Sequence, residues 1–101
     1  MNDCKKMKDK VYTYMVECSD GTLYTGWTSD LYKRMNTHNK GKGAKYTRSR
    51  LPVKLVYYEM YDNKSEALKR EIEIKRMKRK EKLEIIKNFN LKKEKSNSYG
   101  Y

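Results

Sequence analysis

Two short runs of β-branched and aromatic residues flank a Ser-Asp-Gly segment near the start of the chain. Residues 11–17 and 22–27 have the composition of strands, and the segment between them is typical of a tight turn. The pattern therefore predicts a β-hairpin, and the length of its loop decides which side chains share a face.

A two-residue loop would place Tyr14 and Tyr24 on opposite faces, because side chains alternate along a strand. A three-residue loop, with Gly21 left-handed, is a type I turn followed by a glycine bulge. It places Tyr12, Tyr14 and Tyr24 on one face and leaves Gly26 opposite Tyr14. We favour the three-residue loop, although tyrosine is common in strands of every kind.

Helical spacing dominates most of the chain beyond the hairpin. Leu31, Met35 and His38 form an apolar stripe on a helix that ends near Asn39, and Thr28 or Ser29 is expected to cap it. The later elements are a short helical turn within 44–50, a strand at 53–59, a helix at 64–78 that begins at a capping box at 63–66, and a second apolar stripe at 83–89. The last two stripes are out of phase, which predicts a break or kink at 78–80.

These elements predict one small domain of the α/β (α+β) class. Residues 1–10 are polar and are expected to form a flexible N-terminus, and residues 11–89 form the domain. Residues 90–101 are expected to be a disordered basic tail, because they contain few apolar side chains.

The chain has 25 lysines and arginines against 13 acidic residues, a formal net charge of +12 over 101 residues. Such an excess favours a polyanionic partner, with nucleic acid first and an acidic membrane surface second, although lysine-rich usage alone is an alternative. No apolar run approaches the roughly 20 residues of a membrane span, and the N-terminus lacks the apolar core of a signal peptide. We therefore expect a cytoplasmic protein without a membrane partner. Cys4, Cys18 and His38 fall short of a four-ligand zinc site.

Four residues could act on a phosphate. Tyr14 and Tyr24 could bind phosphate oxygens or take a proton from water, provided that positive charge or metal lowers a pKa that is ordinarily near 10. Arg34 could hold a phosphate with its planar guanidinium, and His38 lies one helical turn further on. Taken singly, Arg34 is equally typical of a solvated helix face, and His38 of a helix end.

Glu71 falls within the apolar stripe of the helix at 64–78. A carboxylate in that position needs a partner. Lys75, one turn further on, could supply one as an ion pair. A divalent cation is the other possibility, because Mg²⁺ takes one or two carboxylates and keeps waters for phosphate chemistry. The helix alone does not decide between them.

The segment Gly41-Lys42-Gly43-Ala44-Lys45 is basic and rich in glycine, but it lacks the Gly-Lys-Ser/Thr ending of a Walker loop. Lys42, Lys45 and Arg48 are candidate contacts to a sugar-phosphate backbone. A simple helix-breaking connection is an equally good interpretation of the glycines.

Taken in order, these residues resemble the GIY-YIG nuclease family, in particular its small stand-alone bacterial members. Tyr12-Thr13-Tyr14 stands in place of Gly-Ile-Tyr, and Tyr24-Thr25-Gly26 in place of Tyr-Ile-Gly. Arg34 and His38 match the arginine and frequent histidine of the next helix, and Glu71 matches the glutamate of the family. The segment GKGAKYTR resembles the linker of those small members, and the resemblance covers residues 11–88.

The resemblance implies a central three-stranded antiparallel sheet flanked by helices. It also implies hydrolysis of DNA phosphodiester bonds with one divalent metal, Mg²⁺ or Mn²⁺, held by Glu71. One motif tyrosine would activate water and Arg34 would stabilise the phosphate. We favour Tyr14 as the base, with Tyr24 orienting water or phosphate.

Two hypotheses follow for the function. The first is a metal-dependent endonuclease, with branched or single-stranded DNA in repair or recombination as its candidate substrate. The second is a basic nucleic-acid-binding module that keeps the fold without useful turnover. Substrate structure, pathway and oligomeric state stay open.

Overall fold

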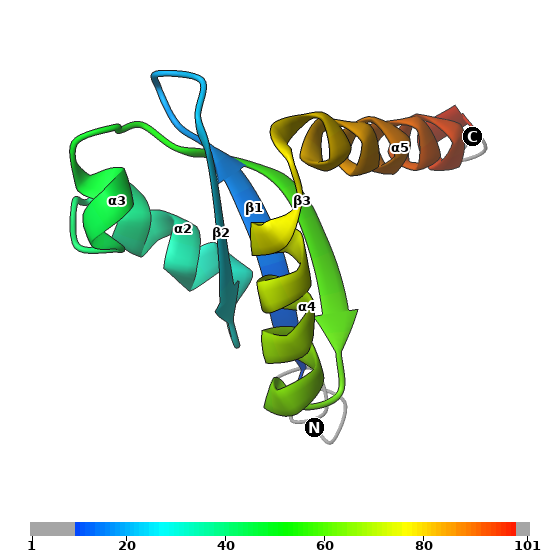
Figure 1. Ribbon diagram of the computed structural model, residues 1–101, viewed down its shortest axis with the longest axis horizontal. Coiled ribbons are helices and arrows are strands. Elements are labelled where there is room, and N and C mark those ends of the chain that lie inside the picture. Colours follow the sequence, from blue (N-terminus) through cyan, green and yellow to red (C-terminus); the bar gives the residue numbers. More distant parts are fainter. Residues whose placement is uncertain (1–9, 99–101) are drawn as a thin grey trace.

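The computed structural model describes residues 10–98, with side chains to residue 91. Three strands form one antiparallel sheet in the order β2-β1-β3, from β1 (Val11–Glu17), β2 (Leu23–Thr28) and β3 (Lys54–Tyr61). The helices are α2 (Leu31–Asn39), α3 (Lys45–Arg48), α4 (Lys64–Arg76) and α5 (Arg79–Ser98). The predicted sheet flanked by helices is confirmed (Figure 1).

The alternation of β1 divides the core between the two faces of the sheet. Tyr14 and Val16 point to one face, where Leu31 and Met35 of α2 pack on them. Met15 points to the other face, where it contacts Ile74 of α4 in a cluster that includes side chains of α5. Figure 1 shows α2 and α3 beside β2, α4 across the sheet, and α5 directed away from it.

The start of α2 differs from the prediction. Asp30 is the N-cap, and its carboxylate accepts a hydrogen bond from the Lys33 amide at 3.1 Å. Thr28 instead accepts a bond from the Asp30 amide at 3.1 Å, so it stabilises the turn that leads into the cap. The cap of α4 is as predicted, since Asn63 accepts from the Glu66 amide at 2.9 Å.

The predicted break between the last two helices is present, but it lies at residues 77–78 and so begins slightly before the predicted 78–80. The first of them, α4, ends at Arg76, Met77 is extended, and α5 begins at Arg79. Helical phase predicts that Ile72 shares the apolar stripe of Ala67 and Ile74, but Ile72 is 50% exposed while the other two are fully buried.

The predicted disordered tail is wrong over residues 90–98, where α5 continues to Ser98. Leu91, Lys92, Lys93, Glu94 and Lys95 are good helix formers, which favours a helix in a segment of low apolar content. Residues 1–9 and 99–101 lie outside the description, and with them most of the predicted flexible N-terminus and Cys4. Within residues 10–98, every helix is too short or too polar to cross a membrane.

A charged cluster joins β3 to α4. The Glu59 carboxylate accepts hydrogen bonds from the phenols of Tyr57 and Tyr61 and from Arg70 Nε, the latter at 3.0 and 3.1 Å. Burial, together with the neighbouring Glu59 carboxylate, raises the pKa of Tyr57 to about 12. Because Arg70 compensates Glu59, this cluster is a structural feature.

Two threonines stand where the family motifs have isoleucine. Thr13 is fully buried and donates its hydroxyl to the Ala67 carbonyl at 2.7 Å, which fastens α4 to the sheet. The buried Thr25 hydroxyl has no hydrogen-bond partner within the described residues. Both lie on the α4 face of the sheet, so they alter its packing and leave the tyrosine face unchanged.

Candidate active site

The hairpin has the three-residue loop that the sequence predicts. Gly21 has a φ of 84°, and the Cys18 amide donates to the Thr22 carbonyl at 2.8 Å. Val16 then pairs with Tyr24 and Tyr14 with Gly26, so both tyrosines face the same side of the sheet.

Gly26 makes room for the tyrosine pair. A Cβ atom at this position would lie 2.7 Å from Tyr14 Oη and 3.1 Å from a ring carbon of Tyr24. Contacts below 3.0 Å force a neighbour to move, and Tyr14 is completely buried. The glycine opposite Tyr14 is therefore required by the position of the phenol.

Hydrogen bonds link Tyr14 to α2. Arg34 Nε donates to Tyr14 Oη at 3.2 Å, and Tyr14 Oη lies 2.9 Å from His38 Nε2. The one-turn spacing of Arg34 and His38 thus brings both side chains to the same phenol, as expected for neighbours on one side of a helix. The Arg34 guanidinium therefore points toward the tyrosine pair.

A contact with Thr47 determines which ring nitrogen of His38 carries the proton. Thr47 Oγ1 donates to the Ala44 carbonyl at 2.9 Å and lies 3.0 Å from His38 Nδ1. Because the only hydroxyl proton of Thr47 is used, Nδ1 must carry a proton and donate it. His38 Nε2 is then an acceptor, and the Tyr14 hydroxyl donates to it.

Thr47 and Gly43, which complete this network, were not singled out from the sequence. A Cβ at position 43 would lie 2.4 Å from His38 Nδ1, so only glycine lets the connection pass close to the ring. The basic segment at 41–45 therefore has a packing function beside His38. The pair of glycines was a visible signal, but nothing in the spacing indicates that Thr47 returns to the imidazole.

Burial and positive charge act in opposite directions on Tyr14. Burial raises the pKa of Tyr14, and the Arg34 hydrogen bond and charge lower it, while the charges of Tyr24 and Glu71 raise it further. Burial, followed by the Arg34 charge, lowers the pKa of His38. At neutral pH the site therefore holds a protonated phenol beside a neutral imidazole that can accept its proton.

Tyr24 is held by stacked rings. Its ring lies 5.7 Å from that of His38 and stacks on Tyr46 of α3, with centroids 6.0 Å apart. Arg50 covers the Tyr46 ring at 4.0 Å, and its Nε donates to Asp20 in the hairpin loop at 3.0 Å. No pattern in the sequence indicates that Tyr46 joins the site, because Tyr24 is distant from it in the chain.

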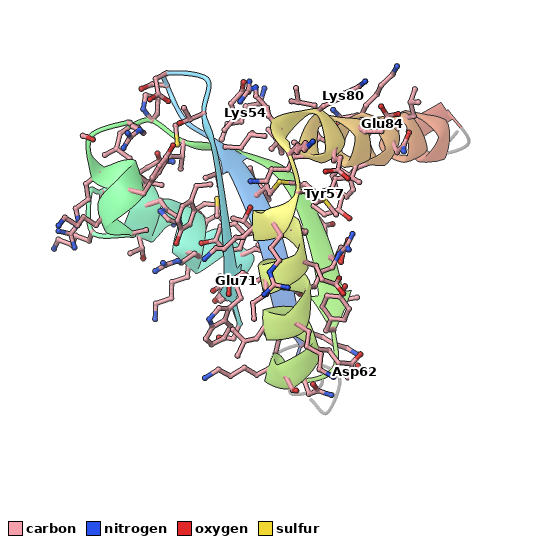
Figure 2. The ribbon with its side chains drawn as sticks, viewed as in Figure 1. Lys54, Tyr57, Asp62, Glu71, Lys80 and Glu84 are labelled. Atoms are coloured by element: carbon pink, nitrogen blue, oxygen red, sulfur yellow. The ribbon has the colours of Figure 1, made fainter. Side chains whose placement is uncertain are left out.

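Glu71 has features of both environments expected for it, the ion pair with Lys75 and the shielded position of a metal ligand. Its side chain is only 14% exposed, and its nearest ionic partner is Lys75 Nζ at 3.5 Å, on a lysine side chain that is 52% exposed. Figure 2 shows Glu71 on the side of α4 nearest to β2. The Glu71 carboxylate is near enough to Tyr14 for its negative charge to raise the pKa of the Tyr14 phenol.

The donor set decides which cation this region fits. Among the described residues, no three histidine, cysteine, aspartate or glutamate side chains gather in a group suited to a metal. A single shielded carboxylate is insufficient for zinc but matches Mg²⁺, which keeps its waters and takes phosphate oxygens as further ligands. The residues thus fit a metal held jointly by Glu71 and a substrate phosphate.

The structure places Lys42, Lys45 and Arg48 on the surface, along α3 and the connection that leads into it. All three side chains are exposed, and they flank the segment that packs on His38. They lie beside the hydrogen-bond network of Tyr14 without joining it. Such a position suits side chains that contact a long polyanion.

Acidification should destabilise the protein through His38. Since burial lowers the pKa of His38 in the fold, the unfolded chain binds the proton first as pH falls below about 6.5. We expect the melting temperature to fall between pH 7 and pH 5, and His38→Gln to flatten that slope. The pKa values of Asp20 and Asp62 are lowered, so their contributions are lost only at more acidic pH. Equal slopes in both proteins would contradict this account of His38.

The sequence of the chain matches the model of a known family. The model of the GIY-YIG catalytic domain matches residues 10–84. The chain belongs to the GIY-YIG family. The match spans β1 to the first turns of α5, so it includes every side chain of the Tyr14 network.

Relatives of the same size agree with the family assignment. A UPF0213 protein of Staphylococcus saprophyticus is 60% identical over 78 residues, which cover 77% of this chain and 95% of that protein. A UPF0213 protein of Syntrophus aciditrophicus is 62% identical over 79 residues, which cover 77% and 91%. The similarity therefore extends over nearly the whole length of these relatives.

Two solution NMR structures share the fold. The UPF0213 protein BH0048 of Bacillus halodurans is 42% identical, with a TM-score of 0.51 over 77% of this chain and 83% of that one. The protein EF2693 of E. faecalis is 39% identical, with a TM-score of 0.56 over 81% and 88%. The GIY-YIG sheet and its helices therefore recur in proteins of this size.

Proposed function

We propose that this GIY-YIG protein is a divalent-metal-dependent endonuclease that hydrolyses DNA phosphodiester bonds. The observation that carries the proposal is the Tyr14 hydroxyl, which is bonded to both Arg34 and His38 and senses the charge of Glu71. Arg34 would then be the cation that binds the phosphate and His38 the proton acceptor at one phenol, with Glu71 as the proposed metal ligand near them.

Tyr14 is the proposed general base. Its oxygen takes a proton from the attacking water while its own proton passes to His38 Nε2, so no free phenolate accumulates in the buried site. The water oxygen forms a bond to phosphorus as the phosphorus–oxygen bond to the leaving nucleotide breaks. The imidazolium that results is stabilised by the Thr47 hydroxyl oxygen, which accepts from Nδ1 and in turn donates to the Ala44 carbonyl.

In this proposal, Arg34 and a metal ion held by Glu71 would stabilise the negative charge on the phosphate. Arg34 uses Nε for Tyr14 and has further N–H groups with which to hold non-bridging oxygens. Glu71 would hold Mg²⁺ or Mn²⁺ together with a phosphate oxygen, and the metal would supply Lewis-acid stabilisation. Tyr24, kept in place by Tyr46, would orient the water or the phosphate.

Binding to DNA should depend steeply on salt, because exposed Lys42, Lys45 and Arg48 are proposed to contact phosphates. Each phosphate neutralised contributes a slope of about −0.9 in log K against log salt. Lys45→Gln should weaken binding about equally for all sequences and make the slope shallower by about one. Fluorescence anisotropy over a salt series measures both, with Lys69→Gln on the exposed face of α4 as the matched control. An affinity for DNA that does not change with ionic strength would contradict an interface formed mainly with phosphates.

The function is tested by incubating the protein with single-stranded, flapped and branched DNA of matched length. Each substrate is supplied with Mg²⁺, with Mn²⁺ or with EDTA, and the products are resolved on denaturing gels. We expect chelator-sensitive cleavage and a preference for one DNA structure. Tight binding without cleavage of any substrate would instead support the basic nucleic-acid-binding module.

A further inference from the structure

Two hollows meet at Arg34 on the outside of the site. One, of about 300 Å³, is lined by Trp27, Thr28, Ser29 and Arg34. The other, of about 190 Å³, is lined by Arg34 and the residues around the N-terminus of α2, among them Asp30 and Lys33. A groove therefore runs past the guanidinium that is proposed to hold the reacting phosphate.

Trp27 forms the aromatic wall of this groove. It directly follows Gly26 on β2 and points to the opposite face of the sheet from Tyr14, at the strand end that Figure 1 shows between α2 and α4. The ring is partly exposed, and Lys64 Nζ lies 4.8 Å from its centroid. Lys64 is an exposed, flexible side chain, so a ligand can replace it over the indole.

A larger hollow, of about 330 Å³, lies between β3 and α5 and is a poorer candidate for a ligand. It is lined by Tyr57, Glu59 and Phe89, among others, and contains no residue of the Tyr14 network. Glu59 is already compensated by Arg70 there. The groove at Trp27 combines an aromatic surface with the cations that a nucleotide needs.

We propose that an unpaired nucleobase next to the reacting phosphate stacks on Trp27. This inference rests on the proposed function for the position of that phosphate. Base–aromatic stacking tolerates every sequence, and Arg34 and Lys64 supply charges for the adjoining phosphates. The hollow has about ten times the roughly 30 Å³ that one water occupies in the liquid, which is room for a planar base.

The stacking contact selects the form of the substrate. A base inside a duplex is already stacked on both sides and must be unstacked before it can reach Trp27. A base in a single strand or at a frayed junction is available without that cost. Trp27 should therefore favour DNA that is unpaired at the cleavage position.

Intrinsic fluorescence tests the proposal without catalysis, because Trp27 is the only tryptophan in the chain. A single-stranded oligonucleotide and a blunt duplex of equal length are titrated in EDTA, while anisotropy follows binding. We expect the single strand to quench Trp27 strongly at saturation and the duplex to quench it far less. Unchanged fluorescence with a fully bound single strand would overturn the proposal.

Variants separate stacking from general binding. Trp27→Leu should weaken single-strand binding by about tenfold and change duplex binding by less than twofold, and Trp27→Phe should keep most of the affinity. The control is Tyr32→Leu, which removes an aromatic side chain that is 81% exposed and lines neither hollow. Equal losses for both DNAs would overturn the proposal, and melting curves identify a misfolded variant.

The outcome is independent of the proposed nuclease activity. If the protein cleaves DNA but the single strand does not quench Trp27, only the stacking contact is lost. If quenching occurs but no substrate is cleaved, Trp27 binds a base in a protein that lacks turnover.

Discussion

Replacing Tyr14 by phenylalanine is expected to lower metal-dependent cleavage by about 10²–10⁴-fold, the usual contribution of a general base. The ring still fills the core, but the hydroxyl that joins Arg34 and His38 is lost. His38 Nε2 is then a buried acceptor without its donor, which should cost about 1–3 kcal/mol of stability. Single-turnover cleavage and thermal melting measure the two effects.

Tyr57→Phe is the matched control. Tyr57 is also buried and also donates its hydroxyl, but to Glu59 on the other side of α4. Figure 2 shows Tyr57 close to the turn between α4 and α5, away from Glu71. Its variant should lose some stability and keep its cleavage rate. If the two variants cleave equally well, Tyr14 is not the base.

Replacing Glu71 by glutamine is expected to abolish metal-dependent cleavage and to leave the melting temperature unchanged or slightly higher. The change keeps the shape of a side chain that is 14% exposed and removes its charge. As a metal ligand, the carboxylate cannot be replaced by a neutral amide without loss of charge at the phosphate. Its removal also relieves a shielded charge that only one flexible lysine compensates.

A structural role for Glu71 predicts a different pair of results. If the Lys75 ion pair were its whole function, glutamine should cost at most about 1 kcal/mol and leave cleavage unchanged. Glu73→Gln serves as the control on the same helix, because Glu73 pairs with Arg70 at 3.1 Å and is 62% exposed. Whether Glu71 binds a metal or only pairs with Lys75, Glu73→Gln should have the small effect on stability that is expected for loss of a surface ion pair, and it should leave cleavage unchanged.

The parts of the site that the sequence predicts are those set by local rules. Gly21 fixes the loop, the loop fixes the register, and the register places Tyr14 and Tyr24 on one face. One helical turn then brings Arg34 and His38 together at Tyr14. Each step depends on residues that are close in the chain.

The parts that it does not predict are brought together by tertiary packing. Thr47 reaches His38 because the connection that leads to α3 passes close to the imidazole at Gly43, and Tyr46 meets Tyr24 because α3 packs beside the hairpin. No periodicity encodes either contact. Helical phase alone also does not show that Ile72 is 50% exposed while Ala67 and Ile74 on the same helix are fully buried, because it does not show how the helix rests on the sheet.

The most direct test of the account is a Mg²⁺ titration of single-turnover DNA cleavage, with the unchanged protein and Glu71→Gln side by side. The substrate is the DNA that the unchanged protein cleaves best. The account predicts cleavage that saturates with Mg²⁺, stops in EDTA and returns when Mg²⁺ is restored, with none by Glu71→Gln at any concentration. Cleavage that persists in EDTA, or that is equally fast in the variant, would contradict it.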